Sequence, residues 1–397
     1  MKMDSNQRAF FALVRAGLWA DRWSVQEFKS SRVPDSVDWK KVYKLAAEQS
    51  VQGLVLQGLE WYKEHKPECV VSLPQDILFQ LIGDVQMIEQ QNKCMNDFVA
   101  KLIEKLRKED VYALLVKGQG IAQCYERPLW RASGDVDLLL DASNYEKAKK
   151  TLLPLASDVD TEYKSLKHLE MTMSGGFVVE LHGMLHSRLS SRIDRTIDEA
   201  QNDVFCGGNV RSEEFQSSNC SNVQVFLPSP DNDVIFIFTH ILKHFYIEGI
   251  GLRQICDLCR LLWTYRESLN HVLLESRLHK AGLMSEWKAF ASFAVEYLGM
   301  PVDAMPLYNA NDNLNRKAER ILEFVIETGN FGRNRNIERS KFFFIGKIQA
   351  ACFKLGDFAH HARLFPLDSV KFYLHYLFDG ILQAYAKKTS QRNNSKN

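Results

Sequence analysis

The chain has 397 residues, of which 46% are hydrophobic and 25% are charged. Both values are ordinary for a folded protein and exclude a largely disordered chain, while 21 glycines and 10 prolines exclude a collagen-like or low-complexity one. The formal net charge of +1 gives the molecule no overall field that attracts nucleic acid or an anionic membrane. We therefore expect two or three folded domains, and the charge gives no strong signal for nucleic-acid binding.

Cysteine usage and hydropathy indicate the compartment. The eight cysteines lie far apart, and the first residues lack the long apolar core of a secretory signal. We expect free thiols in a reducing compartment, and hence a cytoplasmic protein. The longest apolar stretch, residues 234–247, contains His240, Lys243 and His244, so we expect no membrane span and no membrane partner.

The first region, residues 1–95, is predicted to be an N-terminal helical region. Apolar residues recur at helical spacing in residues 10–19 and 42–51. A further helical stripe follows at residues 98–106, with lysine and glutamate on its opposite side.

The second region, residues 96–228, changes to strand character. Apolar runs at residues 112–116 and 136–140 predict two short strands. The extended segments 168–173 and 177–182 are joined by a Ser-Gly-Gly sequence, which predicts a hairpin.

Two other segments of this region have their own signals. Ser143 with Glu146 fits the capping box of a helix that ends before Pro154. Residues 206–222 are rich in glycine, serine and asparagine, and we interpret them as a surface loop.

The third region, residues 229–385, is predicted to be a C-terminal helical domain. It opens with Asp231, which can cap the first long helix. Arg253, Asp257 and Arg260 share one helix face, which predicts an intrahelical ion-pair cluster.

The order of these regions predicts the fold class. Helices, a small mixed β-sheet and then more helices indicate an α+β fold, in which the sheet forms a core between two helical regions. The last residues, 386–397, are polar and basic and are predicted to form a disordered tail.

Two aspartates in the second predicted strand are the first candidate functional residues. Side chains alternate across a strand, so Asp135 and Asp137 point to the same face. Neighbouring carboxylates in a largely apolar strand repel each other and are stabilised when a cation lies between them. For these two residues alone, a chance pair at a solvated sheet edge is an equally good interpretation.

Nearby residues favour the interpretation that a cation binds between these two aspartates. Lys117 and Arg131 place positive charges near the same end of the sheet, where phosphates need them. Gly118 and Gly120 allow backbone N–H groups to approach a phosphate. Glu180 lies in an apolar strand, where an acid is costly unless it is paired or ligated. The combination predicts a site for a metal and phosphates.

These residues resemble a known pattern. Lys-Gly, then Arg, then Asp-x-Asp followed by aliphatic residues, then Glu-Leu-His is similar to the DNA polymerase β-type nucleotidyltransferase superfamily. Within it, the chain resembles an uncharacterised bacterial nucleotidyltransferase family that carries this core between helical regions. Similar segments at residues 13–18, 240–244 and 251–258 extend the resemblance over most of residues 5–265.

The resemblance implies roles for single residues. Asp135 and Asp137 would hold Mg²⁺, with two ions expected and Mn²⁺ as a substitute. Glu180 would be the third carboxylate, either a metal ligand or the base for an acceptor hydroxyl. Lys117 and Gly118 would stand where the superfamily has its Gly-Ser phosphate loop, although here a glutamine follows the glycine.

The implied activity is the transfer of a nucleoside monophosphate from a nucleoside triphosphate such as ATP to a hydroxyl-type acceptor, with release of pyrophosphate. Lys117 and Arg131 would neutralise the β- and γ-phosphates. The acceptor stays open between a small molecule, a protein hydroxyl and an RNA 3′ end. Two alternatives stay open as well: a catalytically inactive nucleotide sensor or scaffold of this fold, and a toxin-like tRNA nucleotidyltransferase.

Several further residues have both a functional and a structural interpretation. His182 shares a strand face with Glu180 and either orients it or is a structural histidine. Asp257 is either a member of the ion-pair cluster or, as the resemblance implies, an accessory site residue.

The helix that contains His240, Lys243 and His244 presents these three residues on one side. We expect His244 to be a packing residue or an accessory contact to nucleotide or acceptor. The basic and aromatic segment 333–347 is interpreted as a basic-faced helix rather than a nucleic-acid contact.

Overall fold

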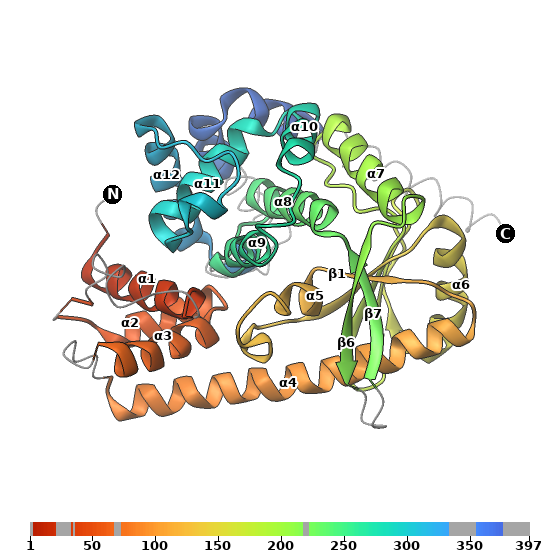
Figure 1. Ribbon diagram of the computed structural model, residues 1–397, viewed down its shortest axis with the longest axis horizontal. Coiled ribbons are helices and arrows are strands. Elements are labelled where there is room, and N and C mark those ends of the chain that lie inside the picture. The colour runs from red at the N-terminus through yellow and green to blue at the C-terminus, as the bar shows by residue number, and fades with distance from the viewer. Residues whose placement is uncertain are drawn as a thin grey trace, which may run out of the picture.

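The computed structural model describes residues 3–20, 33–34, 36–66, 73–216, 222–332 and 355–375. The predicted tail at 386–397 and the basic segment 333–347 lie outside these ranges. The fold is α+β, as predicted, with helices on both sides of a small mixed sheet (Figure 1).

The N-terminal helices pack through a close crossing. The helices are α1 (Ser5–Leu18), α2 (Trp39–Glu48) and α3 (Gln52–His65). A Cβ atom at Gly17 of α1 would overlap the carbonyl of Leu54, and one at Gly58 of α3 would overlap the carbonyl of Leu13. The two helix backbones therefore approach each other more closely than any larger residue allows.

Helix α4 (Gln75–Lys108) is a single helix of 34 residues that runs beneath both the N-terminal helices and the sheet (Figure 1). Leu81 belongs to the hydrophobic core of the helical regions, whereas Met95 and Val99 belong to the core under the sheet. The predicted boundary between residues 95 and 96 falls inside this helix. The division of the chain into domains stays a prediction.

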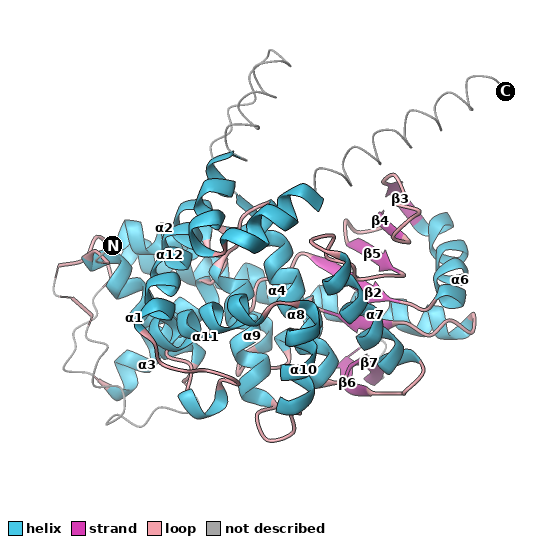
Figure 2. Cartoon of the chain, turned by 90° about the horizontal axis from the view of Figure 1, so that it is seen from above, coloured by secondary structure: helices cyan, strands magenta, loops and turns pink. Residues whose placement is uncertain are grey.

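The five-stranded sheet is mixed. Its strands, in spatial order, are β1 (Leu114–Val116), β2 (Asp135–Leu139), β5 (Val178–His182), β4 (His168–Met173) and β3 (Ala156–Val159). β2 and β5 are parallel, and the other pairs are antiparallel. Figure 2 shows β2, β5, β4 and β3 in a row, with helix α6 (Ala142–Leu152) next to them.

Alternation along the strands separates a buried face from a functional face. In β2, Val136 and Leu138 are buried in the core that the sheet shares with α4 and α6. Asp135 and Asp137 alternate with these residues along the strand and therefore lie on the opposite face. In β5, Val179 lies in the same core, which places Glu180 on the face of the aspartates.

One expectation about the sheet region is wrong. The interpretation of residues 206–222 as a surface loop fails, because β6 (Val210–Gln216) pairs with β7 (Asn222–Pro228) in an antiparallel ribbon. In β6 only Phe215 is buried, so the strand has almost no apolar alternation that the sequence could show.

Two predicted helix caps are also wrong. Helix α6 begins at Ala142 because Asp141, not Ser143, accepts hydrogen bonds from the first free N–H groups. Helix α8 (Pro230–Ile247) has Ser229 as its N-cap, and Asp231 instead accepts a hydrogen bond from the backbone of the segment before α10.

The last region is helical, as predicted. Its elements before residue 333 are α8, α9 (Leu252–Thr264), α10 (His271–Ala281), α11 (Met284–Leu298) and α12 (Asp312–Thr328), and α7 (Ser191–Phe205) precedes β6. Residues 355–364 and 366–375 are also helical. Short 3₁₀ turns lie at Pro128–Trp130, Leu153–Leu155, Val302–Ala304 and Asn330–Gly332.

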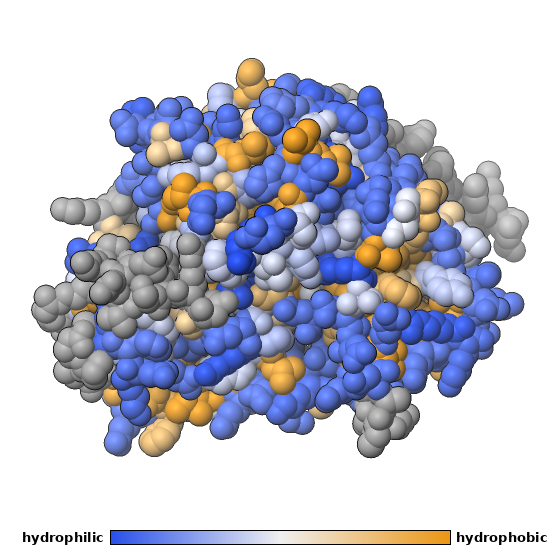
Figure 3. Space-filling view, viewed as in Figure 1, coloured by the Kyte–Doolittle hydropathy of each residue, from blue (hydrophilic) through white to orange (hydrophobic). Residues whose placement is uncertain are grey.

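The molecular surface is mixed in character. On the face shown in Figure 3, hydrophobic residues form small separate patches among hydrophilic ones, as in many folded proteins. In the part of the chain that the structure describes, no helix has both the length and the apolar content needed to cross a membrane.

Candidate active site

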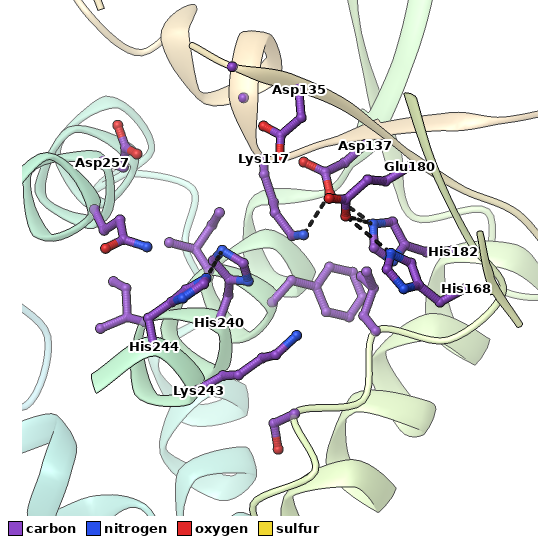
Figure 4. Close-up of a pocket in the computed structure, with 18 of the residues that line it drawn as sticks. Lys117, Asp135, Asp137, His168, Glu180, His182, His240, Lys243, His244 and Asp257 are labelled. Carbon is purple, nitrogen blue, oxygen red and sulfur yellow. Dashed lines mark hydrogen bonds and ion pairs between the residues drawn. The ribbon is translucent and has the colours of Figure 1, made fainter. Parts of the chain in front are cut away.

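A cavity of about 360 Å³ lies between the functional face of the sheet and helices α8 and α9. Strands β2 and β5 supply the three carboxylates of one wall, called here the acidic wall, and β4 adds His168 to it. Helix α8 supplies the opposite wall (Figure 4). Pockets of this size hold small-molecule ligands. The cavity therefore has one wall from the sheet and one from the helical region.

Three carboxylates converge on the acidic wall. Parallel pairing of β2 with β5 places Asp137 directly beside Glu180, and Asp135 precedes Asp137 on the same face. One oxygen from each of the three lies within 4.8 Å of the other two. Asp137 is only 2% exposed, so this negative charge is held largely away from water.

The electrostatics of the cluster reflect this crowding. Asp137, burial and Glu180 together raise the pKa of Asp135 to about 6. Burial also acts to raise the pKa of Glu180, but hydrogen bonds to His168 and His182 and the charge of Lys117 outweigh it and lower that pKa below its usual range. Glu180 is therefore ionised in this site, and a bound cation would offset the repulsion that raises the pKa of Asp135.

Lys117 is the cation that the chain itself supplies. Its Nζ lies 2.7 Å from Asp137 Oδ1. Burial opposes the charged form, but Asp137 and Glu180 raise the pKa of Lys117 above its usual value. Lys117 also has a left-handed backbone with φ of 57°, a conformation that is costly for a residue with a side chain. The turn after β1 therefore holds this ammonium against the carboxylates at a conformational cost.

The opposite wall carries nitrogen groups. His240 and His244, one turn apart on α8, lie 3.0 Å apart through their Nε2 atoms, and His244 Nδ1 lies 2.9 Å from Glu248 Oε2. Burial and the charge of Lys117 lower the pKa of His240, and burial lowers the pKa of His244. The two imidazoles are therefore neutral near pH 7.

Lys243 extends from α8 into the cavity between these walls (Figure 4). Burial and the charge of Lys117 lower its pKa. Among the residues that the structure describes, no carboxylate forms an ion pair with Lys243. Lys243 therefore favours the binding of an anion in this part of the cavity.

The family model described as "Uncharacterised nucleotidyltransferase" matches residues 35–299, which include every residue that lines the cavity. The chain belongs to this nucleotidyltransferase family. Comparison with curated proteins and with solved structures gives no match. The family assignment agrees with the resemblance noted in the sequence and gives the chain its general class, a nucleotidyltransferase.

The two glycines that the sequence predicts at the candidate site differ in position. Gly118, at the start of α5 (Gly118–Ala122), lines the cavity. Gly120 does not, because it faces Leu227 of β7, whose side chain a Cβ atom would overlap. Gly120 therefore lets α5 pack against the ribbon, and a phosphate contact there stays a prediction.

Arg131 and Asp257 form a buried pair at the edge of the cavity. Arg131 Nε and Nη2 donate to the two oxygens of Asp257 at 2.8 and 2.7 Å, and Nη1 donates to Ser133 Oγ. The interpretation of Asp257 as part of an intrahelical cluster is wrong, because its carboxylate bonds across to the segment before β2. The guanidinium of Arg131 is satisfied within the protein, and its contact with phosphate stays a prediction.

His182 and His168 lie beside Glu180. The Nε2 atom of His182 is 2.8 Å from Asp137 Oδ1 and 3.2 Å from Glu180 Oε2. His168, which sequence reasoning missed, also places its Nε2 atom 3.2 Å from Glu180 Oε2. The predicted hairpin was the signal that could have found it, because its register sets His168 opposite His182.

Proposed function

We propose that this chain transfers a nucleoside monophosphate from a nucleoside triphosphate to a hydroxyl group, with Mg²⁺ held by Asp135, Asp137 and Glu180. The observation that carries the proposal is the clustering of these three carboxylates in a cavity whose opposite wall supplies Lys243, in a chain of the nucleotidyltransferase family.

The residues present fit a magnesium ion. Mg²⁺ prefers oxygen ligands and usually bridges one or two carboxylates to substrate phosphates. The three carboxylates offer such oxygens, and the raised pKa of Asp135 reflects a repulsion that a cation relieves. When bound, one or two such ions, or Mn²⁺ in their place, would neutralise charge on the α-phosphate and on the leaving group.

The protein's own cations would hold the rest of the triphosphate. Lys243 faces the cavity with no ion pair to any described residue, so β- and γ-phosphates would supply the missing negative charge. Lys117 is already paired with Asp137, and it would limit the repulsion between the carboxylates and the incoming phosphates.

The transfer itself is a substitution at the α-phosphorus. The acceptor oxygen forms a bond to this phosphorus while the bond to the oxygen that bridges the α- and β-phosphates breaks, and pyrophosphate leaves with that electron pair. The proton of the acceptor hydroxyl passes to a base. Glu180 is one candidate for this base and also a candidate metal ligand, and its lowered pKa favours the role of metal ligand. The cavity limits the acceptor to a group that reaches the space between β5 and α8.

Calorimetric titration of the full chain with each of the four nucleoside triphosphates tests the proposal without knowledge of the acceptor. We expect binding that requires Mg²⁺ and that Asp137→Asn abolishes. The matched control is Asp158→Asn, the same substitution at an exposed aspartate on β3. Absence of binding for all four nucleotides, or equal binding in Asp137→Asn, would contradict the proposal.

Pyrophosphate release then separates an enzyme from a nucleotide sensor. An inactive protein of this fold binds the nucleotide but releases no pyrophosphate with any mixture of acceptors. Labelling of RNA by a radioactive nucleotide would identify the tRNA-directed alternative.

A further inference from the structure

A second group of metal-ligating side chains lies beside the three carboxylates. Antiparallel pairing of β4 with β5 sets His168 directly opposite His182, and Glu180 is two residues before His182 on the same face. The two imidazole rings are nearly parallel, at 15°, with centroids 4.7 Å apart. In Figure 4 both rings point toward the Glu180 carboxylate. Two imidazole nitrogens and one carboxylate oxygen therefore lie close together.

The spacing of these atoms matches a metal coordination shell. Both Nε2 atoms lie 3.2 Å from Glu180 Oε2, and the three donor atoms lie within 4.8 Å of one another. Zinc binds imidazole nitrogen and carboxylate oxygen at about 2.0 to 2.2 Å, which puts neighbouring ligands about 3 to 3.5 Å apart in tetrahedral or octahedral geometry. The spacing of the donor atoms therefore suits one shell, and because the two rings are nearly parallel, at least one imidazole has to tilt until its plane contains the metal.

The available protons cannot form a hydrogen bond across every close pair of polar atoms in this cluster. His182 Nε2 lies within bonding distance of both Asp137 and Glu180, but a neutral imidazole nitrogen carries a single proton. Asp137 Oδ1 accepts from Lys117 as well, and Glu180 Oε2 faces both imidazoles. One shared cation satisfies the imidazole lone pairs and the carboxylate together.

We propose that His168, Glu180 and His182 form a site for zinc or a similar divalent transition metal, separate from the oxygen-only site at Asp135 and Asp137. Imidazole nitrogens suit zinc, cobalt and nickel, whereas Mg²⁺ selects oxygen ligands. Glu180 belongs to both sites and would bridge them. The inference does not rest on nucleotidyl transfer, because it concerns the ligand set alone.

Zinc titration of the metal-stripped full chain, without nucleotide, tests this site. We expect one Zn²⁺ per chain that an excess of Mg²⁺ does not displace, and an affinity at least tenfold weaker in His168→Ala. The matched control is His186→Ala, since His186 also lines the cavity and bonds a carboxylate, Asp198, at 2.7 Å. Equal zinc affinity in wild type and His168→Ala would overturn the proposal, as would a wild type that binds no zinc.

A second variant and a spectroscopic readout exclude a purely structural role. His168→Asn keeps a hydrogen-bond donor beside Glu180 but is a poor zinc ligand, so it is expected to weaken zinc binding as His168→Ala does. In the cobalt-loaded protein, X-ray absorption is expected to count two imidazole ligands in the wild type and one in either variant. A metal shell without imidazole would overturn the assignment. Nucleotide titrations report on the proposed function separately, so the failure of one proposal is visible without that of the other.

Discussion

Lys243 stands out at the scale of single residues, because it faces a cavity without a carboxylate partner among the described residues. Burying a cation costs free energy unless a ligand compensates for it. The natural compensation in a nucleotidyltransferase is a phosphate. We therefore expect Lys243 to have opposite effects on stability and on ligand binding.

Replacing Lys243 with methionine separates these two effects. We expect Lys243→Met to weaken binding of the Mg²⁺–nucleotide complex about tenfold, or ~1.4 kcal/mol, because the phosphates lose a cation. The melting temperature of the ligand-free protein is expected to stay level or to rise, because a partly buried cation that has no ion pair to a described residue is removed. Calorimetry and thermal unfolding measure the two quantities.

The matched control is Lys280→Met, which removes an exposed lysine paired with Glu199. We expect neither quantity to change in it. A fall in melting temperature in Lys243→Met, with nucleotide affinity unchanged, would show that Lys243 has a structural role instead.

The Arg131–Asp257 pair acts at the scale of elements, because it ties the segment before β2 to helix α9. Both side chains are less than a tenth exposed. Asp257→Ala leaves the guanidinium buried and unpaired, and we expect it to cost about 3 to 5 kcal/mol in the free energy of unfolding. Urea denaturation measures this quantity.

The double variant Arg131→Met with Asp257→Leu tests whether the unpaired charge is the cause. It should recover much of the loss, since neither Arg131 nor Asp257 is then left as an unpaired buried charge. A double variant as unstable as Asp257→Ala would mean that the shape of the pair matters more than its charge.

The crossing of α1 and α3 gives a test of packing between elements. Gly17→Ala places a methyl group against the carbonyl of Leu54, and we expect it to lower the free energy of unfolding by about 1 to 3 kcal/mol. Gly83→Ala is the control, because no atom lies within 4 Å of a Cβ atom there, on α4. It should stabilise the helix by up to about 1 kcal/mol. Equal effects in the two variants would refute the close crossing.

The sequence predicted the part of the candidate site that depends on a local pattern. The alternation in residues 135–139 and 178–182 predicts which carboxylates share a face, because a strand repeats every two residues. It could not reach the bond between Arg131 and Asp257, which are 126 residues apart and meet only through packing. It also missed β6, because an exposed strand buries almost nothing and so shows no apolar alternation.

At the scale of the whole molecule, pH acts on stability through Glu286. This residue of α11 is fully buried, and Tyr246 donates a hydrogen bond to it at 3.1 Å. Burial raises its pKa from 4.5 to about 8. Between these values the folded chain keeps the proton and the unfolded chain has lost it, so Glu286 lowers stability by about 1.4 kcal/mol for each pH unit of rise.

Glu286→Gln should remove this dependence. Relative to wild type, its free energy of unfolding is expected to rise steadily from pH 5 to pH 8, whereas the exposed Glu267→Gln should follow wild type throughout. Chemical denaturation across this pH range measures the difference. A constant difference between Glu286→Gln and wild type would show that Glu286 is ionised in the folded protein.

Asp135, Asp137 and Glu180 are proposed to hold the metal that accompanies the nucleotide. Diffraction from crystals grown with Mn²⁺ and a non-hydrolysable nucleoside triphosphate tests this proposal most directly, because manganese gives an anomalous signal. We expect manganese to lie among these three carboxylates, with the β- and γ-phosphates directed toward Lys243. Manganese and nucleotide bound away from β2 and β5 would contradict it.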